Sequence, residues 1–421
     1  MRKKHFLFAS VLALLCSSST LHAQDFKLTS SGYFKNQGVD VMAFDDIYPE
    51  GHQGGVCIIM NGHRVATNGD IRLEATPGQW QPVPKQLDRK LGDNSITATL
   101  CYPDSSRHLT GFNPMIYPDL HLIYTVNVES KGKNIEVTVD LDRPIPQEFI
   151  GKVGFNLEFF PGSLFGKPWI MDGQSGIFPQ QPNSPLMTTQ PNYLHTGNYH
   201  DGKKSLADMD KLIGKGYSPI VADDIISEPY AKGTKFTSRP DDPYNKVTIE
   251  SLSGDLQLFD GRMNHNNGWF VLRSNIKPGV TKGAVKWIIT PNVVADWMYQ
   301  PVIQTSQIGY HPTQDKEAVI EMDIRDNRKE TAQIIRIDAD GEKVVKNVTP
   351  ANWGKFLRYN YLKVNFTDVK EPGLYKIKYN TSVSPIFRID NDVYARGVWQ
   401  PVLEYFLPVQ MCHMRVRSEE R

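Results

Sequence analysis

Three pairs of neighbouring aspartates are the first residues whose types suggest chemistry. Hydrolysis of a glycosidic bond uses two carboxyl groups that face one another across that bond. Neighbouring residues of a β-strand point to opposite faces, so none of these pairs can act by itself. Proline and tyrosine residues lie near each pair, which is typical of turns. The pairs are Asp45-Asp46, Asp223-Asp224 and Asp241-Asp242. We therefore assign no catalytic residue from the sequence.

Tryptophan and tyrosine rings are the second group of interest, because the apolar face of a sugar ring packs well on an aromatic ring. Trp169 and Tyr193 lie within residues 160–199, a stretch rich in Gly, Pro, Gln and Asn that we interpret as a long ordered loop. We predict these two residues as carbohydrate-contact candidates, and a core position remains the alternative for Trp169. Trp287 lies in an alternating apolar stretch and is predicted to belong to the core.

Neither a metal nor a cofactor is predicted from the motifs of this chain. No cysteine or histidine spacing resembles a metal site, and the sequence has no phosphate-binding loop or serine-nucleophile motif. The Asp and Asn oxygens of residues 260–268 suit calcium, but tight turns alone explain this loop. The formal net charge is +1, and the basic residues are scattered, so electrostatics favours neither nucleic acid nor an anionic membrane as a partner.

The N-terminus, residues 1–23, is predicted to be a cleaved secretory signal. Residues 2–4 are basic, residues 6–15 are apolar, and Ala23 precedes the expected cleavage point. The apolar run is shorter than the roughly 20 residues that span a bilayer, and no other segment is long enough to cross one. We expect export to the periplasm or the extracellular space, with a lipoprotein anchored through Cys16 as the alternative.

Cys57 and Cys101 lie in or beside apolar stretches. An exported protein allows a disulfide between them. Buried free thiols are the simpler interpretation, and the sequence leaves both open.

The elements that must position these residues are mainly β-strands. Residues 120–128 and 135–141 alternate apolar with polar side chains around the polar turn 130–134, which predicts a hairpin. Similar alternation recurs up to about residue 290. We predict a large N-terminal β-sandwich-type domain over residues 24–300. Short strands and turn signals predict a second, smaller antiparallel sandwich over residues 301–389.

Residues 390–421 change character and predict a short C-terminal helix. Apolar residues recur there mostly at spacings of three and four, which gives one helical stripe. They are Val398, Trp399, Val402, Leu403, Phe406, Val409 and Met411. We expect this stripe to pack against further helices, and we interpret the segment as the start of a truncated helical domain.

The second sandwich resembles the immunoglobulin-like domain that precedes the catalytic domain of family 9 glycoside hydrolases. Residues 306–310, Ser-Gln-Ile-Gly-Tyr, are similar to its Asn-Gln-x-Gly-Tyr opening, with Ser306 as a departure. Residues 385–389 resemble its exit, and residues 392–406 resemble the first helix of the family's barrel of paired helices. Residues 410–415 and the N-terminal region are similar to exported enzymes of gut Bacteroidetes.

This resemblance implies a parent enzyme of carbohydrate metabolism that hydrolyses β-glucosidic bonds in polysaccharides with inversion. The family's base lies in an Asp-rich motif after the first helices and its acid is a distant Glu. Neither motif occurs here. We therefore expect a non-catalytic N-terminal portion, with the missing barrel as its intramolecular partner and a β-glucan as the polysaccharide. The alternatives are a polysaccharide-capture protein without hydrolytic activity, and an enzyme with its own site at Asp223, Asp224 or Asp260.

Overall fold

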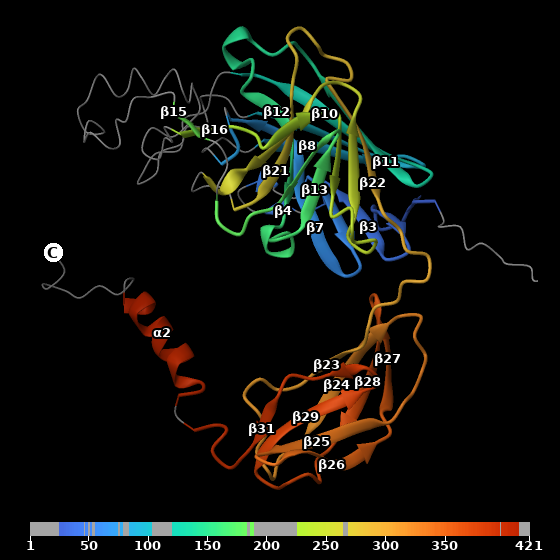
Figure 1. The fold of residues 1–421 in the computed structure, drawn as a ribbon, viewed down its shortest axis with the longest axis vertical. Helices are drawn as coiled ribbons and strands as arrows, with labels where there is room; N and C mark the ends of the chain where they lie inside the picture. The colour runs from blue at the N-terminus through green and yellow to red at the C-terminus, as the bar shows by residue number, and fades with distance from the viewer. Residues whose placement is uncertain are drawn as a thin grey trace, which may run out of the picture. The chain divides into compact units, whose positions relative to one another are not determined.

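The chain divides into two compact units, residues 1–297 and 298–421 (Figure 1). The sequence predicts the boundary between the two domains after Gln300, close to the observed division after Trp297. The computed structural model describes residues 25–45, 47–48, 51–52, 55–74, 76–78, 84–102, 120–182, 186–188, 225–263, 268–395 and 397–411. The predicted signal sequence, residues 1–23, lies outside these ranges.

The first unit contains two nine-stranded antiparallel sheets. In spatial order, the first sheet consists of β1 (Lys27–Leu28), β2 (Phe34–Asn36), β3 (Val39–Ala43), β6 (Val56–Met60), β7 (His63–Leu73), β12 (Val153–Phe159), β21 (Phe270–Asn275), β20 (Leu256–Asp260) and β17 (Ala231–Gly233). All seven residues of β12 are buried, so this strand has no solvent-facing side.

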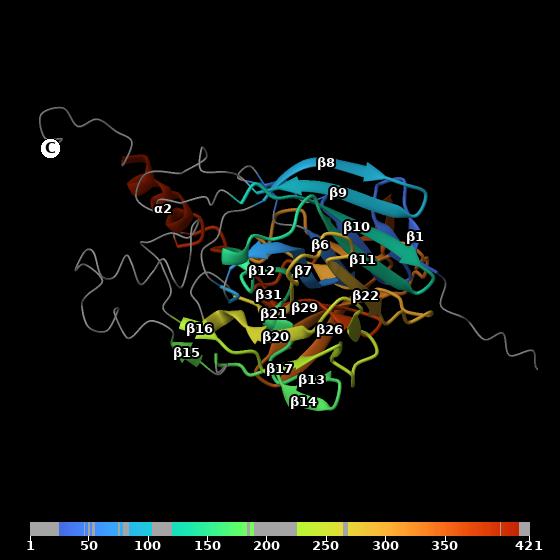
Figure 2. The same ribbon diagram turned by 90° about the horizontal axis from the view of Figure 1, so that it is seen from above.

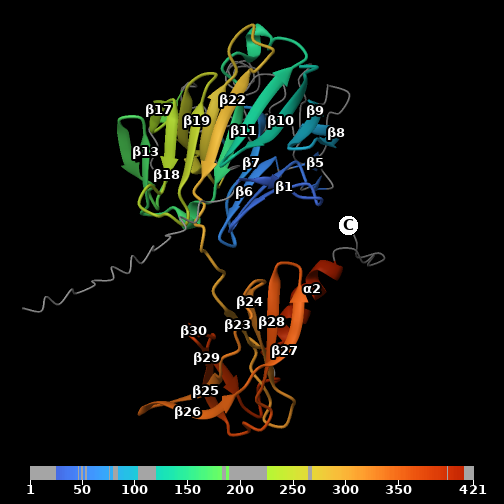
Figure 3. The ribbon, with the colours of Figure 1, turned by 90° about the vertical axis from the view of Figure 1, so that its right-hand side faces the viewer.

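The second sheet runs in the order β14 (Gln174–Ile177), β13 (Pro168–Met171), β18 (Lys235–Ser238), β19 (Val247–Ser251), β22 (Val285–Pro291), β11 (Asn134–Leu141), β10 (Ile123–Lys131), β9 (Ser95–Cys101) and β8 (Lys85–Leu91). Figure 2 shows β8 to β11 side by side, and Figure 3 shows most of the layer. The predicted hairpin is confirmed, because Lys131 pairs with Asn134 across a turn at which Gly132 has a φ of 63°.

Residues 168–177, expected to belong to a long loop, form the hairpin of β13 and β14 instead. Asp172, with a φ of 49°, and Gly173 make its turn. Asp-Gly between two short strands is a strong hairpin signal, and the surrounding Gly and Pro residues obscured it. Smaller elements of this unit are β4 (Ile47–Tyr48), β5 (Gly51–His52), β15 (Leu186–Thr188), β16 (Ile225–Ser227), and the 3-10 turns Gln147–Phe149, Pro161–Ser163 and Gly261–Met263.

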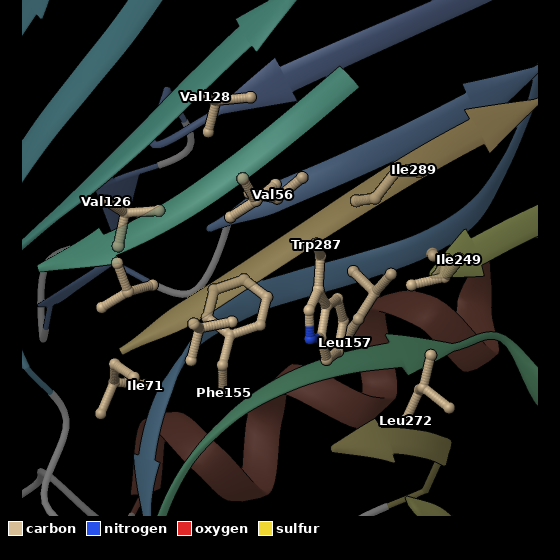
Figure 4. Packing of buried hydrophobic residues seen from close by; sticks show 14 of the residues in the cluster. Val56, Ile71, Val126, Val128, Phe155, Leu157, Ile249, Leu272, Trp287 and Ile289 are labelled. Carbon is tan, nitrogen blue, oxygen red and sulfur yellow. The ribbon is translucent and has the colours of Figure 1, made fainter. Parts of the chain in front are cut away.

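The two sheets pack face to face around one hydrophobic core (Figure 4). Trp287 of β22 meets Phe155 of β12 edge to face, with ring centroids 4.9 Å apart. The indole N–H donates a hydrogen bond to Ser274 Oγ at 3.0 Å, so the buried polar atom has a partner. Trp287 is therefore a core residue, as the sequence predicted. Cys57 in β6 and Cys101 at the end of β9 are both thiols.

The second unit is a smaller sandwich followed by a helix. Its four-stranded sheet has the order β23 (Val302–Gln304), β24 (Glu317–Asp323), β28 (Tyr359–Asn365) and β27 (Ala351–Phe356). The facing sheet contains β26 (Gly341–Val348), β25 (Ala332–Asp338), β29 (Gly373–Tyr379) and β30 (Ser382–Val383), and β31 (Phe387–Ile389) also pairs with β29. Helix α2 spans Gln400–Met411. The prediction of a mainly β protein with two sandwiches and a short C-terminal helix is confirmed.

We predict that Phe155→Ala lowers the free energy of unfolding of the first unit by about 3–5 kcal/mol, because it leaves a cavity against Trp287. Urea unfolding followed by circular dichroism measures the change. Leu252→Ala is the control, because Leu252 is 60% exposed and its truncation should change stability by less than about 0.5 kcal/mol. Equal effects of the two substitutions would contradict the assignment of the core.

Candidate functional site

Trp169, one of the two predicted carbohydrate-contact residues, lies in β13 with its side chain buried. Its indole lies beside the Tyr230 ring, with centroids 6.4 Å apart, and a Cβ on Gly176 of β14 would collide with it. The structure thus places Trp169 in the core position that the sequence left open as the alternative. Tyr193 lies outside the described residues, so its contact with carbohydrate stays a prediction.

Asp242 closes a turn. Its carboxylate accepts hydrogen bonds from the Tyr244 backbone N–H at 2.8 Å and from Asn245 Nδ2 at 3.0 Å, and it pairs with the Arg239 guanidinium. Desolvation acts to raise the pKa of this carboxyl, but the hydrogen bonds and the arginine charge prevail and lower it. Among the other paired aspartates, Asp45 lies 3.9 Å from Arg89, whereas Asp46, Asp223 and Asp224 lie outside the described residues.

Asp260, at the start of the polar loop considered for calcium, is fully buried. Arg262 donates to both of its carboxylate oxygens at 2.8 Å, and Tyr230 Oη donates to Oδ2 at 3.1 Å. The Arg262 guanidinium lies 4.4 Å from the centroid of the Phe270 ring. Both carboxylate oxygens of Asp260 therefore already accept hydrogen bonds from protein donors. The described residues contain no group of three or more His, Cys, Asp or Glu side chains that could hold a metal ion.

A buried polar network in the first sheet is the most conspicuous site that sequence reasoning missed. Glu74 follows β7, Asn156 lies in β12 and Arg273 lies in β21. Asn156 Nδ2 donates to Glu74 Oε1 at 2.6 Å, and Arg273 Nη1 donates to the same oxygen at 3.2 Å. The Glu74 network, as we call it, consists of Asp70, Arg72, Glu74, Asn156, Glu158 and Arg273, all of them buried.

Strand register explains why these residues meet. In β12, Phe155 and Leu157 belong to the core between the sheets, so Asn156 and Glu158 lie on the opposite face. Asn156 is the partner of Arg273 on one side and of Asp70 on the other. The sequence signal was the alternation of charged and apolar residues over 70–74, which is typical of a strand with a solvent-facing side.

The environment of the Glu74 carboxyl brings its pKa close to neutral pH. Burial raises its pKa from the usual 4.5 to about 7, although Arg273 and Arg72 act to lower it and Glu158 acts to raise it. Carboxyl groups with such a pKa occur at catalytic sites, but also in structural ion-pair networks. Arg273 donates hydrogen bonds to Glu74, Asn156, Asn275 and the Lys152 carbonyl, all of which are protein acceptors. We interpret the network as a structural connection between strands that responds to pH.

The predicted opening motif of the second sandwich fixes its first loop to its last strand. Tyr310 Oη donates to the Glu317 carbonyl at 3.0 Å and accepts from the Ser306 backbone N–H at 3.0 Å. Its ring packs edge to face on Phe387. Gly309 has a φ of 104°, and a Cβ there would collide with the Arg388 carbonyl. The motif is thus explained by packing and backbone geometry.

Part of the predicted apolar stripe is exposed on helix α2 and at Trp399 just before it, whereas the side chains of Val409 and Met411 lie outside the described residues. Trp399 is 52% exposed, Val402 is 62% exposed and Phe406 is 53% exposed. Leu403, between them on the same face, donates its backbone N–H to the Trp399 carbonyl at 3.2 Å, which closes the first turn. None of the described helices is long and apolar enough to span a membrane.

Residues 302–389 form a sandwich of two antiparallel sheets, and helix α2 follows its last strand, β31. Comparison with protein families identifies it further: residues 298–384 match the family described as the cellulase N-terminal immunoglobulin-like domain. The resemblance predicted from residues 306–310 and the segments that follow is confirmed for this domain.

Solved structures of family 9 glycoside hydrolases also match part of the chain. A metagenome-derived family 9 endoglucanase is 29% identical, with a TM-score of 0.20, over 21% of this chain and 18% of its own. A thermostable endoglucanase from Alicyclobacillus acidocaldarius is 22% identical, with a TM-score of 0.21, over 25% and 17%. A Bacteroides ovatus family 9 protein is 26% identical, with a TM-score of 0.19, over 22% and 16%. Each match therefore spans less than a fifth of the solved protein. No curated protein matches the chain.

We predict that Glu74→Gln flattens the pH dependence of stability of the first unit. Below pH 4.5 the carboxyl is protonated whether the chain is folded or unfolded. Between pH 4.5 and 7 only the folded state keeps the proton, so stability should fall as pH rises through this window. Between pH 4.5 and 7 the free energy of unfolding should fall by on the order of 2–3 kcal/mol more for the wild-type protein than for Glu74→Gln.

Urea unfolding at half-unit pH steps measures this difference. Glu250→Gln is the matched control, because Glu250 forms a surface ion pair with Lys235 and should leave the wild-type profile unchanged. Parallel profiles for the wild-type protein and Glu74→Gln would show that Glu74 does not titrate in this window.

Proposed function

We propose that this chain is a non-catalytic, exported part of a family 9-type glycoside hydrolase that acts on β-glucosidic polysaccharides. The observation that carries the proposal is the match of residues 298–384 to the cellulase N-terminal immunoglobulin-like domain. That domain leads directly into α2, whose exposed apolar stripe suits a packed helical partner. The two β units would then support a catalytic domain. The basic and apolar character of residues 1–23 supports export.

The engagement of the described carboxylates supports the non-catalytic role. An inverting glycosidase needs one carboxyl group that delivers a proton and a second that activates water, with space between them for the sugar and the water. Asp242 is held by Arg239 and Asn245, and Asp260 is buried against Arg262. In both cases protein donors occupy positions that substrate or water would need.

We predict that the purified chain releases no reducing ends from soluble β-glucan or carboxymethyl cellulose above a protein-free blank. A colorimetric reducing-end assay over several hours measures this. The chain after heat denaturation serves as the control for trace contamination. Release at enzymatic rates that disappears on denaturation would refute the non-catalytic role, and alanine substitutions at Asp223, Asp224 and Asp260 would then locate the site.

We also predict that the stripe on α2 promotes self-association. A contiguous apolar surface of this kind is uncommon on a monomeric soluble protein. Val402→Lys combined with Phe406→Lys should shift the protein towards the monomer in sedimentation velocity at micromolar concentration. Glu404→Lys is the control, because Glu404 lies on the opposite side of the helix from the stripe. Unchanged association in the double variant would contradict the role of the stripe.

A further inference from the structure

One outer surface of the immunoglobulin-like domain carries a group of aromatic side chains, which we call the aromatic face: Tyr299, Trp353, Phe356, Tyr359 and Tyr361. Four of the rings, those of Tyr299, Tyr359, Tyr361 and Trp353, follow one another in contact. The centroid distance is 5.1 Å from Tyr299 to Tyr359, 6.1 Å from Tyr359 to Tyr361 and 5.6 Å from Tyr361 to Trp353. The rings thus form a connected row across one side of the four-stranded sheet, where β24, β28 and β27 lie side by side (Figure 3).

The strand register turns these rings outward. Tyr359 and Tyr361 alternate in β28 with the buried residues Asn360 and Leu362, so the tyrosines leave the sheet on its outer side. Phe356 of β27 is the register partner of Tyr359 and therefore lies on the same side. Trp353 is 56% exposed, as is Phe356, so the row offers ring surface to a ligand.

A β-bulge places Trp353 in this row. In β27 the register shifts between Asn352, which pairs with Leu362, and Gly354, which pairs with Tyr361, so Trp353 is the extra residue. Gly354 has a φ of 123°, a conformation that glycine adopts without strain, and no neighbouring atom lies within 4 Å of the position that a Cβ would take. The glycine therefore serves the backbone geometry of the bulge.

A carboxylate lies at the centre of the aromatic face. Glu321 of β24 is the register partner of Tyr361, and its two oxygens accept hydrogen bonds from Tyr299 Oη at 3.0 Å and from Tyr361 Oη at 3.3 Å. Among the described residues no cation forms an ion pair with Glu321. A carboxylate has about four acceptor positions, so it can accept further hydrogen bonds beside the two that the tyrosines supply.

The carboxylate decides between two classes of occupant. An apolar protein surface packed over this face would bury a carboxylate that forms no ion pair among the described residues, which is costly. A carbohydrate has hydroxyl groups that donate to a carboxylate and apolar ring faces that pack on aromatic rings. The combination of exposed rings with a carboxylate that can accept further hydrogen bonds therefore suits a neutral polyhydroxylated chain.

We propose that the aromatic face is a carbohydrate-binding surface that holds a β-glucan chain, with Trp353 and Tyr361 contacting sugar rings and Glu321 accepting hydroxyl hydrogen bonds. The choice of a β-glucan rests on the function proposed above, whereas the class of ligand follows from the face itself. The surface would hold substrate beside the enzyme and would take no part in bond cleavage.

The test is native affinity electrophoresis of the full chain in gels that contain soluble mixed-linkage β-glucan. The wild-type protein should be retarded as the glucan concentration rises. Trp353→Ala and Glu321→Gln should each raise the apparent dissociation constant about three- to tenfold. Tyr394→Ala is the matched control, because Tyr394 is an exposed aromatic residue of this unit that donates a hydrogen bond to Gln314 and belongs to no ring contact of the face.

Thermal unfolding verifies that each variant is folded. Tyr361→Phe removes the hydroxyl and keeps the ring, so it separates the contribution of the hydroxyl to binding from that of the ring. Retardation that is lost in Trp353→Ala and kept in Tyr394→Ala would support the proposal. Equal retardation of all variants, or none for the wild-type protein, would overturn it. So would a dimer that Trp353→Ala dissociates, because the occupant would then be a second copy. These outcomes are independent of the reducing-end assay, so failure of the binding surface is distinguishable from failure of the proposed function.

Discussion

The first unit depends on the burial of both faces of its central strands. All residues of β12 are buried, and its neighbours β7 and β21 are almost completely buried as well. One face meets the second sheet through an apolar core, which is the usual solution. The other face carries charges, so their hydrogen bonds must be made within the protein. Glu74 and Arg273, whose side chains are 2% and 1% exposed, form an ion pair at 3.2 Å on this face. Removal of either partner would leave a buried charge, which costs about 3–5 kcal/mol in comparable pairs.

Local patterns predicted those parts of the fold that local interactions determine. The hairpin of β10 and β11 was evident because its two strands alternate and its turn is short. The core position of Trp287 followed from the same alternation. The Glu74 network was not evident, because its partners are 82 and 199 residues apart in sequence. A run such as residues 70–74 has the same pattern whether its charged side faces water or another part of the protein.

The aromatic face shows how a single inserted residue limits such predictions. Leu362 and Val364 alternate with polar residues in the sequence of β28, and this alternation directs Tyr359 and Tyr361 to the other side. Trp353 could not be placed in the same way. The bulge at Gly354 shifts the register of β27 by one residue, so alternation counted from either end of the strand assigns the tryptophan differently. Only the pairing of β27 with β28 settles its side.

Two exposed surfaces of the second unit differ in the chemistry of their centres, and this difference decides what can cover each. The stripe on α2 consists of Trp399, Val402, Leu403 and Phe406; it carries no charge, and its one polar group is the Trp399 indole N–H. Covering it releases water from mostly apolar surface, which suits a packed protein partner. On the aromatic face, any occupant that displaces water from Glu321 must replace the hydrogen bonds of that water. Hydroxyl groups meet this condition and apolar side chains do not, so the two surfaces suit occupants of different chemistry.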